Sequence, residues 1–334
     1  MKAALLLSPE KIVIENIPVP PVTENDVLIR PVLAGICGTD ISVFRGHRPI
    51  TYPFIPGHEV LGYVTAVGEN VSKFKIGQRV IVEPNYPCGE CALCRRGRGA
   101  VCAQKGAMGV NIPGCFSEYA VAPEEFTWPI TDDISDQDAV TIEPLTVSLH
   151  GLFQSGVGEG DTVAVLGCGV VGLLLIHAAT AMGARVVAHD RFAGKLEMAR
   201  SLGAETTDDY VDFETVAALW DQRNVCTVFE CAGVPSTTEL ALAAAPRGSN
   251  VMLLGLSSSP ASFVPMRVVR EGVNIHTSMI YDHPADFARA IELVKSGTLR
   301  PSRVVTHVYP FSSIREALEQ ASTGESGKVL IDMA

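Results

Sequence analysis

The second half of the sequence alternates short apolar segments with longer amphipathic ones, and this alternation limits the possible folds more than any other feature. From Asp161 the chain reads TVAVLG, VVGLLLIHAATAMGA, RVVAHD and AGKLEMARSLGA, and after a less regular stretch VCTVFECAG, STTELALAAA and NVMLLG. Strands that alternate with helices in this way indicate a parallel sheet covered by helices. We therefore expect an α/β domain with a parallel, helix-covered sheet over about residues 149–289.

A glycine-rich turn lies between the first strand and the first helix of this region. Gly167, Gly169 and Gly172 have the spacing G-x-G-x-x-G, and Val170 and Val171 lie between the last two glycines. Glycines let the backbone approach a pyrophosphate, whose charge is stabilised by the free N–H groups and the dipole of the following helix. The motif is weak alone, but the strand before it and the helix after it give the context of a dinucleotide site.

The next predicted strand ends in an acidic residue that bears on the choice of cofactor. Asp190 follows Gly172 by 18 residues, near the distance expected for the residue that binds the adenosine ribose. Its carboxylate would accept hydrogen bonds from the 2′-hydroxyl and repel a 2′-phosphate, which favours NAD. Arg191 weakens this inference, because an arginine there can bind the 2′-phosphate of NADP. We expect NAD, with NADP as the less favoured alternative.

Four cysteines lie close together in the first half of the chain, in the segment PCGECALCRRGRGAVC. Cys88, Cys91, Cys94 and Cys102 are spaced C-x2-C-x2-C-x7-C, which predicts a tetrahedral zinc site. Four unrelated buried cysteines or two disulfides are the alternatives. A site closed by four thiolates has no open coordination position, so this zinc would stabilise a loop and take no part in catalysis.

The first 148 residues contain short β-branched segments separated by proline and glycine, such as DVLIRPVLAGI, GYVTAVGENV and GQRVIVEP. This pattern indicates a compact, mostly β domain, with the cysteine lobe at 88–102. The last stretch, from about 290 to 334, could continue the α/β unit or return to the first domain. We assign it to the first domain, although periodicity alone does not decide.

Composition excludes several classes of partner. The formal net charge is −11, which argues against nucleic acid and anionic membrane surfaces as partners, and therefore against a nucleic-acid-binding zinc ribbon. The first apolar run is too short for a signal peptide, and no stretch approaches the length of a membrane span. We expect a cytoplasmic protein, where nine cysteines are more often metal ligands or free thiols than disulfides.

Three further segments carry metal-binding side chains: GICGTD with Cys37, PGHEVLGYV with His58 and Glu59, and IEPLTVSLHG with Glu143. Each is unremarkable alone. In this order, together with the four cysteines and the GCGVVG turn, they make the chain resemble the zinc-dependent medium-chain dehydrogenase/reductase family over nearly its whole length. The resemblance implies a GroES-like catalytic domain and an NAD-binding Rossmann domain.

The resemblance also implies a second, catalytic zinc, and therefore two zinc ions per chain. In the family this zinc is held by residues at the positions of Cys37 and His58. Alcohol dehydrogenases of the familiar kind add another cysteine, whereas polyol and threonine dehydrogenases have a glutamate where this chain has Glu143. In those relatives the glutamate at the position of Glu59 usually binds the zinc, and the one at Glu143 reaches it directly or through water. Which of the two binds directly in this chain stays open.

The implied chemistry is hydride transfer from a secondary hydroxyl to the nicotinamide, with zinc lowering the pKa of that hydroxyl. In relatives a proton relay starts at the position of Thr39 and continues to a histidine that is Ser42 in this chain. Ser42, His47 or the ribose hydroxyls could complete the relay. Two more departures, Val43 in place of an aromatic residue and Ile280 in place of an arginine, distinguish the expected pocket from that of a standard sorbitol dehydrogenase.

These observations predict an NAD-dependent, zinc-dependent dehydrogenase of a polyol, sugar or sugar acid. Alternatives within the family are an L-threonine dehydrogenase and a simple alcohol dehydrogenase. Outside the enzymes, the alternative is a catalytically silent protein that binds NAD. The resemblance also implies a homodimer or homotetramer, formed through the edge strand expected near residues 273–279.

Overall fold

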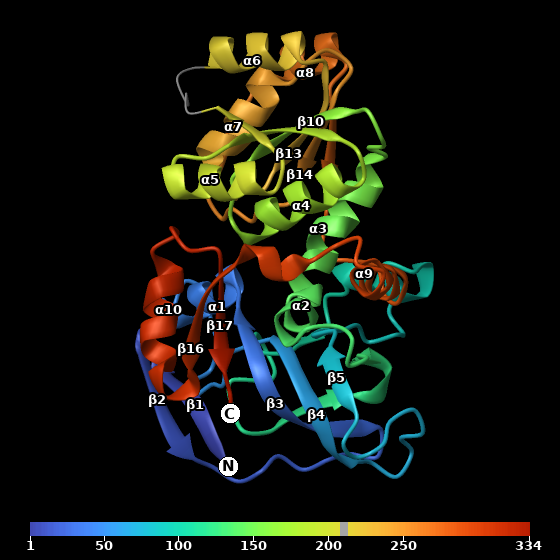
Figure 1. Ribbon diagram of the computed structural model, residues 1–334, viewed down its shortest axis with the longest axis vertical. Coiled ribbons are helices and arrows are strands. Elements are labelled where there is room, and N and C mark those ends of the chain that lie inside the picture. The colour runs from blue at the N-terminus through green and yellow to red at the C-terminus, as the bar shows by residue number, and fades with distance from the viewer. Residues whose placement is uncertain (208–212) are drawn as a thin grey trace. The chain divides into compact units, whose positions relative to one another are not determined.

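The computed structural model describes residues 1–207 and 213–334 (Figure 1). The chain divides into two compact units. The first unit comprises Met1–Glu143 and Val305–Ala334, and the second comprises Pro144–Val304. The sequence predicts boundaries at 148 and about 290. The structure instead places the whole of α9 (Ala285–Lys295) in the second unit.

The second unit contains a six-stranded, fully parallel sheet. Its order, β12-β11-β10-β13-β14-β15, is that of a dinucleotide-binding fold built from two halves that meet between the first and fourth strands. The predicted Rossmann-type sheet is confirmed. The strands are β10 (Thr162–Leu166), β11 (Arg185–His189), β12 (Glu205–Thr207), β13 (Val225–Glu230), β14 (Asn250–Leu253) and β15 (Asn274–Thr277).

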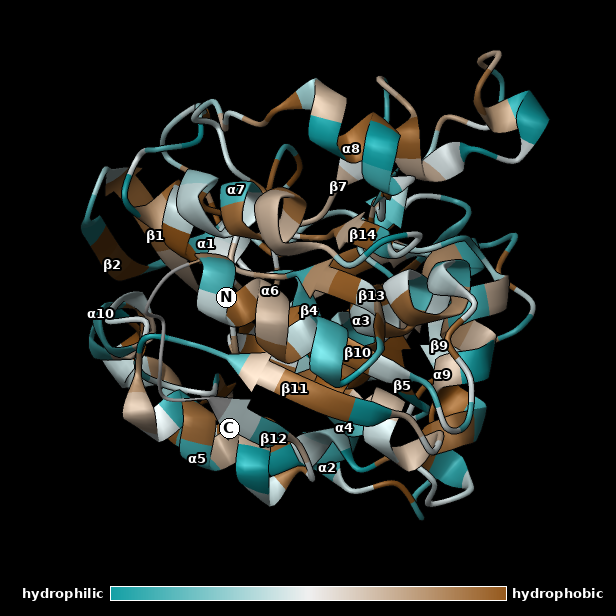
Figure 2. Cartoon of the chain, turned by 90° about the horizontal axis from the view of Figure 1, so that it is seen from above, coloured by the Kyte–Doolittle hydropathy of each residue, from teal (hydrophilic) through white to brown (hydrophobic). Residues whose placement is uncertain are grey.

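Helices cover both faces of this sheet. In Figure 1, α4 and α5 lie below strands β13 and β14 in the view, and α6 and α8 lie above them. Every residue of β10 is buried, as expected for the central strand of a sheet with two covered faces, and Figure 2 shows β11 and β13 as largely hydrophobic. The helices are α3 (Ile142–Ser155), which begins in the first unit, α4 (Val170–Ala181), α5 (Ala193–Ser201), α6 (Phe213–Gln222), α7 (Pro235–Ala244) and α8 (Pro265–Glu271).

The first unit is mostly β, as predicted. Its main sheet has seven strands, in the order β16-β17-β3-β4-β5-β9, with β8 paired to β3. Two smaller two-stranded sheets pair β1 with β2 and β6 with β7. The strands are β1 (Lys2–Ser8), β2 (Lys11–Asn16), β3 (Asp26–Ile36), β4 (Glu59–Val67), β5 (Arg79–Val82), β6 (Asn85–Tyr86), β7 (Gly106–Ala107), β8 (Ala120–Pro123), β9 (Thr127–Pro129), β16 (Val305–Pro310) and β17 (Lys328–Asp332).

The C-terminal segment completes this sheet, because β17 pairs antiparallel with β3. The helices of the first unit are α1 (Gly38–Phe44), α2 (Asp136–Val140) and α10 (Ile314–Ser322). Buried side chains from β3, β4, β17 and α10, with Phe116 among them, form one hydrophobic core. In the described part of the chain, no helix is both long and apolar enough to cross a membrane.

Candidate metal and dinucleotide sites

The four cysteines of the lobe face one another. Sγ of Cys91 lies 3.4 Å from Sγ of Cys94, and Sγ of Cys88 lies 3.6 Å from Sγ of Cys102. Two further sulfur pairs are 3.9 Å apart. Four sulfurs about 2.3 Å from one zinc ion would be about 3.8 Å apart, whereas a disulfide needs about 2.05 Å. The donor set and its spacing therefore fit a tetrahedral zinc site.

Backbone geometry in the lobe favours the thiolate form of two of the four cysteines, whereas burial raises the pKa of Cys94 to about 12. Hydrogen bonds from backbone N–H groups lower the pKa of Cys102 to about 6 and hold the pKa of Cys91 below its ordinary value. Short 3-10 turns at Cys94–Arg96 and Gly99–Val101 give the segment its curvature, and Gly97 between them has a left-handed φ of 74°. Four separated cysteines thus converge within one short segment.

A second cluster lies where β3, α1 and β4 meet. Cys37 follows β3 as the N-cap of α1, His58 precedes β4, and Glu59 is its first residue. One possible ligand atom from each of these three residues lies within 4.8 Å of the other two. A thiol, an imidazole and a carboxylate in such proximity are a fitting donor set for zinc. The structure thus brings together three of the predicted catalytic ligands.

Asp40 organises this cluster and was not singled out in the sequence. Its Oδ1 lies 3.1 Å from Nδ1 of His58 and accepts a hydrogen bond from N of Gly57, and its Oδ2 accepts one from N of Cys37 at 2.9 Å. Because Nδ1 of His58 is engaged, Nε2 is the nitrogen left for a metal. The sequence signal was an acid three residues after Cys37, where a helix capping box would place it.

The same carboxylate governs the protonation of the imidazole. Burial by itself lowers the pKa of His58, but the charge of Asp40 and its hydrogen bond raise it by more, so the pKa lies well above its ordinary value. A carboxylate that binds a histidine in this way also fixes the orientation of the ring.

Glu59 is buried beside Lys328 of β17. The ammonium nitrogen of Lys328 lies 2.5 Å from both carboxylate oxygens, and it donates hydrogen bonds to Oε1 and, at 3.0 Å, to the carbonyl of Ile36. Oε2 of Glu59 is buried and accepts no hydrogen bond of good geometry in the described residues, although the ammonium lies beside it. A carboxylate oxygen has more than one lone pair, so Oε2 could also bind a metal ion.

Glu143 is buried on the first turn of α3. Burial lowers the pKa of Lys328, but the charges of Glu59, Cys37 and Glu143 raise it by more, so the pKa lies above its ordinary value. The charge of Glu143 therefore acts on Lys328, which contacts the cluster. Glu143 is not one of the three residues whose possible ligand atoms lie within 4.8 Å of one another, which are Cys37, His58 and Glu59.

The predicted relay residues lie on α1. Thr39 and Ser42 are three residues apart and both partly exposed, so their side chains share one face of the helix. The carbonyl of Ser42 accepts backbone hydrogen bonds from His47 and Arg48, which follow the helix. His47 thus lies beside the C-terminal end of α1, in an exposed loop.

In the second unit, the three predicted glycines form a tight turn between β10 and α4. Gly167 has φ of 94°, and a Cβ there would lie 2.7 Å from Ala232. A Cβ on Gly172 would lie 1.9 Å from the carbonyl oxygen of Gly167. Gly169 is the N-cap of α4, and a Cβ there would meet no described atom within 4 Å. Only glycine fits the first and third positions, and the second leaves space in front of the helix.

Free N–H groups at the start of α4 face that space. Val170 and Val171 form the first turn of the helix, where backbone N–H groups have no partner within the helix. An anion such as a pyrophosphate is stabilised there by hydrogen bonds and the helix dipole. The predicted glycine motif thus has the structure that a dinucleotide needs.

Asp190 follows β11 beside the glycine turn. Its Oδ2 accepts a hydrogen bond from N of Cys168, and its Oδ1 accepts one from N of Phe192 at 2.9 Å. The Arg191 guanidinium lies 4.7 Å from the centroid of the Phe192 ring. Lys195, which the sequence analysis did not single out, is buried nearby. Burial lowers its pKa, while Asp190 raises it in part.

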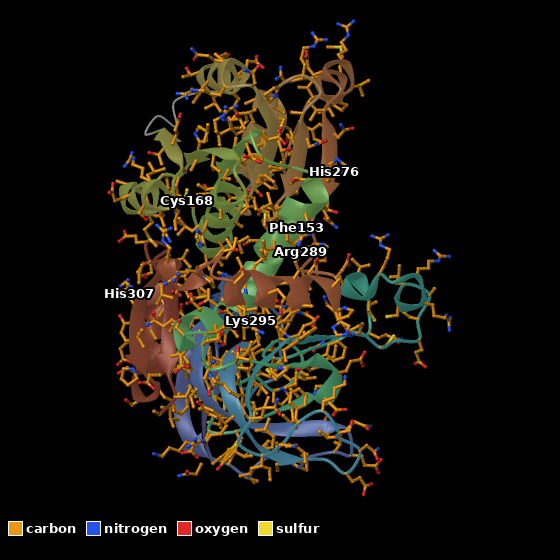
Figure 3. All side chains as sticks on the ribbon, turned by 45° about the vertical axis from the view of Figure 1, so that its right-hand side comes forward. Phe153, Cys168, His276, Arg289, Lys295 and His307 are labelled. Carbon is orange, nitrogen blue, oxygen red and sulfur yellow. The ribbon has the colours of Figure 1, made fainter. Side chains whose placement is uncertain are left out.

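Cys168 lies within the glycine turn and is labelled in Figure 3. Burial raises the pKa of its thiol to about 12, and a thiol that stays protonated is a poor nucleophile and metal ligand. The buried side chain packs in the turn and takes no part in the metal chemistry.

One more group of metal-type side chains occurs in the second unit. His150 of α3 lies 2.7 Å from Asp286 of α9, and the same Asp286 oxygen accepts a hydrogen bond from N of Asp282. On the same two helices, the Arg289 guanidinium lies 3.5 Å from the Phe153 ring centroid (Figure 3). A short His150–Asp286 contact and a cation–π contact therefore join α9 to α3.

Comparisons with known proteins identify the family of the chain. Residues 23–132 match the alcohol dehydrogenase GroES-like domain, and residues 170–296 match the zinc-binding dehydrogenase domain. The chain is 33% identical over 331 residues to sorbitol dehydrogenase of Bacillus subtilis, covering 96% of this chain and 93% of that protein. It is 32% identical over 328 residues to L-threonine 3-dehydrogenase of the same organism, covering 96% and 94%.

Solved structures of similar proteins have the same fold. A protein described as a zinc-binding dehydrogenase from Sinorhizobium meliloti 1021, bound to NADP, is 30% identical with a TM-score of 0.92, covering 99% of each chain. An alcohol dehydrogenase from Escherichia coli CFT073, in complex with NADH, is 29% identical with a TM-score of 0.92, covering 100% of this chain and 99% of that chain. Similar folds therefore occur with both dinucleotides.

Proposed function

Because the chain belongs to the zinc-dependent medium-chain dehydrogenase family, in the branch of polyol and threonine dehydrogenases, we propose that it transfers a hydride from a secondary hydroxyl of a polyol, sugar or sugar acid to NAD. The observation that carries the proposal is the cluster of Cys37, His58 and Glu59, with Glu143 nearby. This donor set has one thiolate and two carboxylates, and therefore suits a substrate that offers two neighbouring oxygens.

The side chains around the cluster have definite tasks. When bound there, zinc would supply Lewis-acid chemistry toward the substrate hydroxyl. Asp40 holds His58 in one tautomer, and Thr39 and Ser42 offer hydroxyl groups on one face of α1 through which a proton can leave. The lobe of Cys88, Cys91, Cys94 and Cys102 would hold the second zinc ion, for stability alone.

NAD is proposed as the cofactor because of Asp190. Two backbone N–H groups fix its carboxylate, and a fixed negative charge at that position repels a 2′-phosphate. The stacking of Arg191 on Phe192 engages the guanidinium that would otherwise favour NADP.

A homodimer or homotetramer is proposed from the edge of the six-stranded sheet. All four residues of β15, the last strand, are exposed, and His276 on it is labelled in Figure 3. On nearby α8, Met266 and Val269 are 64% and 78% exposed. An uncovered edge strand favours pairing with another copy, and antiparallel pairing of two β15 strands would cover it.

A substrate panel tests the proposal. Polyols, aldonates, simple alcohols and L-threonine are offered with NAD or NADP, and reduced cofactor is read by absorbance. We expect the highest kcat/KM for a compound with adjacent secondary hydroxyls. The 32% identity to a threonine dehydrogenase makes L-threonine the second candidate. A kcat/KM for ethanol equal to that of the best polyol would contradict the proposal.

Zinc content separates the enzyme from a silent NAD-binding protein. Two zinc ions per chain, with turnover of any alcohol, support the enzyme. One zinc ion per chain and no turnover with any member of the panel support the silent protein.

A further inference from the structure

Lys328 reaches Glu59 across a strand that lies between them. In the main sheet, β3 lies between β17, which carries Lys328, and β4, which carries Glu59. Val329 pairs with Ile36 and Glu59 pairs with Gly35. Lys328 is 1% exposed and Glu59 is fully buried, so both charges are held inside the unit, away from water.

Gly35 makes this crossing possible. A Cβ on Gly35 would lie 3.0 Å from Cδ of Glu59 and closer still to Oε2. Any other residue would therefore displace the carboxylate. The missing side chain leaves a gap over β3, and the Glu59 carboxylate occupies it within reach of the Lys328 ammonium and the Ile36 carbonyl.

The charges around this gap are mostly negative. The anionic forms of Cys37, Glu59 and Glu143 all act on Lys328, and buried Asp40 adds a further carboxylate beside His58. The ammonium of Lys328 is the positive charge in direct contact with Glu59. Without it, the same centre with zinc would carry one more uncompensated negative charge, in a buried environment where charge interactions are strong.

We propose that Lys328 is a positioning residue of the catalytic metal centre: it holds Glu59 through the gap over Gly35, shares this carboxylate with the metal, and offsets part of the negative charge of the centre. The inference rests on the proposed function, since it assumes zinc at Cys37 and His58. Lys328 limits how strongly Glu59 binds the metal and so preserves the metal's attraction for substrate oxygen.

Removal of the ammonium tests this role. Lys328→Met keeps most of the side-chain volume and loses the charge. Because a cation no longer competes for Glu59, we expect the dissociation constant of the catalytic zinc, measured by chelator competition, to fall by about tenfold or more. In the cobalt-substituted protein the visible absorption bands should shift, since Glu59 binds the metal more fully. Turnover of the best alcohol should fall about tenfold, with the Kd for NAD unchanged. Lys328→Arg should restore part of each property.

A double-mutant cycle shows whether Lys328 acts through Glu59. In a Glu59→Gln background, Lys328→Met should change the zinc dissociation constant by less than about twofold. The Glu59→Gln, Lys328→Met protein has no buried unpaired charge at this pair, so it remains measurable even if the single variant folds poorly. The zinc of the four-cysteine lobe is the internal control and should be retained equally in all variants.

Several outcomes would overturn the inference. An unchanged or weaker zinc affinity in Lys328→Met, an unchanged cobalt spectrum, or an equal effect in the Glu59→Gln background would make Lys328 a purely structural partner. These measurements need no substrate, so they are separate from the substrate panel. A wild-type protein that binds only one zinc ion per chain would overturn the proposed function together with this inference.

Discussion

The carboxylate of Asp190 lies 2.7 Å from the backbone nitrogen of Cys168, which donates it a hydrogen bond. This bond ties the end of β11 to the glycine turn after β10. In the proposed NAD site Asp190 would therefore have two tasks: it shapes the glycine turn, and it presents negative charge where the adenosine ribose would lie.

Asp190→Asn should separate the two tasks. Asparagine keeps an acceptor for one of the backbone N–H groups but loses the charge that repels a 2′-phosphate. We expect the ratio of kcat/KM for NADP to that for NAD to rise by about tenfold. Arg191→Ala in the wild-type protein is the matched control and should leave the use of NAD unchanged. A wild-type protein that already prefers NADP would contradict this assignment and point to Arg191 as the phosphate contact.

Cys91→Ser should remove one zinc ion per chain and lower thermal stability. The remaining three thiolates cannot close the tetrahedral shell, so the lobe loses the metal that stabilises its loop. Zinc content and the melting temperature measure the effect. Cys226→Ser, in the second unit, is the control and should keep both zinc ions. The structural assignment fails if Cys91→Ser keeps full stability and loses only turnover.

Glu143→Gln should weaken polyol oxidation strongly and leave NAD binding nearly unchanged. The carboxylate lies near the cluster of Cys37, His58 and Glu59, and its loss removes an orienting partner of the metal and the substrate. Such losses typically lower activity 10–100-fold. Steady-state kinetics gives the turnover, and a fluorescence titration gives the Kd for NAD. An equal loss of NAD affinity would show instead that Glu143 supports the cofactor unit.

His189 should make the protein less stable in acid. Burial lowers its pKa to about 4, and its Nε2 accepts a hydrogen bond from Nε1 of Trp220. In the unfolded chain His189 has its ordinary pKa of about 6.5, so it is protonated there at a higher pH than in the folded protein. The contribution of His189 to stability is therefore full above about pH 6.5 and is lost as the pH drops toward 4. The loss amounts to about 3 kcal/mol.

Urea unfolding at several pH values measures this effect. His189→Asn should lower stability at pH 7, because Trp220 loses its partner, but should flatten the decline between pH 6.5 and 4 relative to wild type. His276→Asn, on the exposed strand β15, should leave the decline unchanged. An identical pH profile in wild type and His189→Asn would refute the assignment.

The exposed edge of the six-stranded sheet gives an oligomer prediction. Ile275→Glu places a charge on β15, which we expect to prevent strand pairing between copies and to yield monomers by light scattering at micromolar concentration. Val308→Glu, on edge strand β16 of the other sheet, has similar exposure and should leave the assembly intact. A wild-type monomer would refute the proposed interface.

The sequence predicted the second unit well, because its strands and helices alternate with clear periods and a glycine turn fixes the first junction. It also placed Cys37, His58 and Glu59 in one cluster, although only through the family resemblance. The C-terminal stretch was assigned to the first domain, but the pairing of β17 with β3 could not be predicted, since a short apolar strand carries no information about its neighbour. Asp40 had a local capping signal, whereas Lys328 had none, because its partner is set by tertiary pairing alone.

The separation of Glu59 and Lys328 along the chain has a consequence for biosynthesis. They are 269 residues apart, so a ribosome adding about 5–20 residues per second completes the lysine roughly 13 to 54 s after the glutamate. During that interval Cys37, His58 and Glu59 have been made, but the strand that supplies their counterion has not. A nascent chain would therefore present these ligands to cellular metal in an open, uncompensated form, and only the last strand would close the centre.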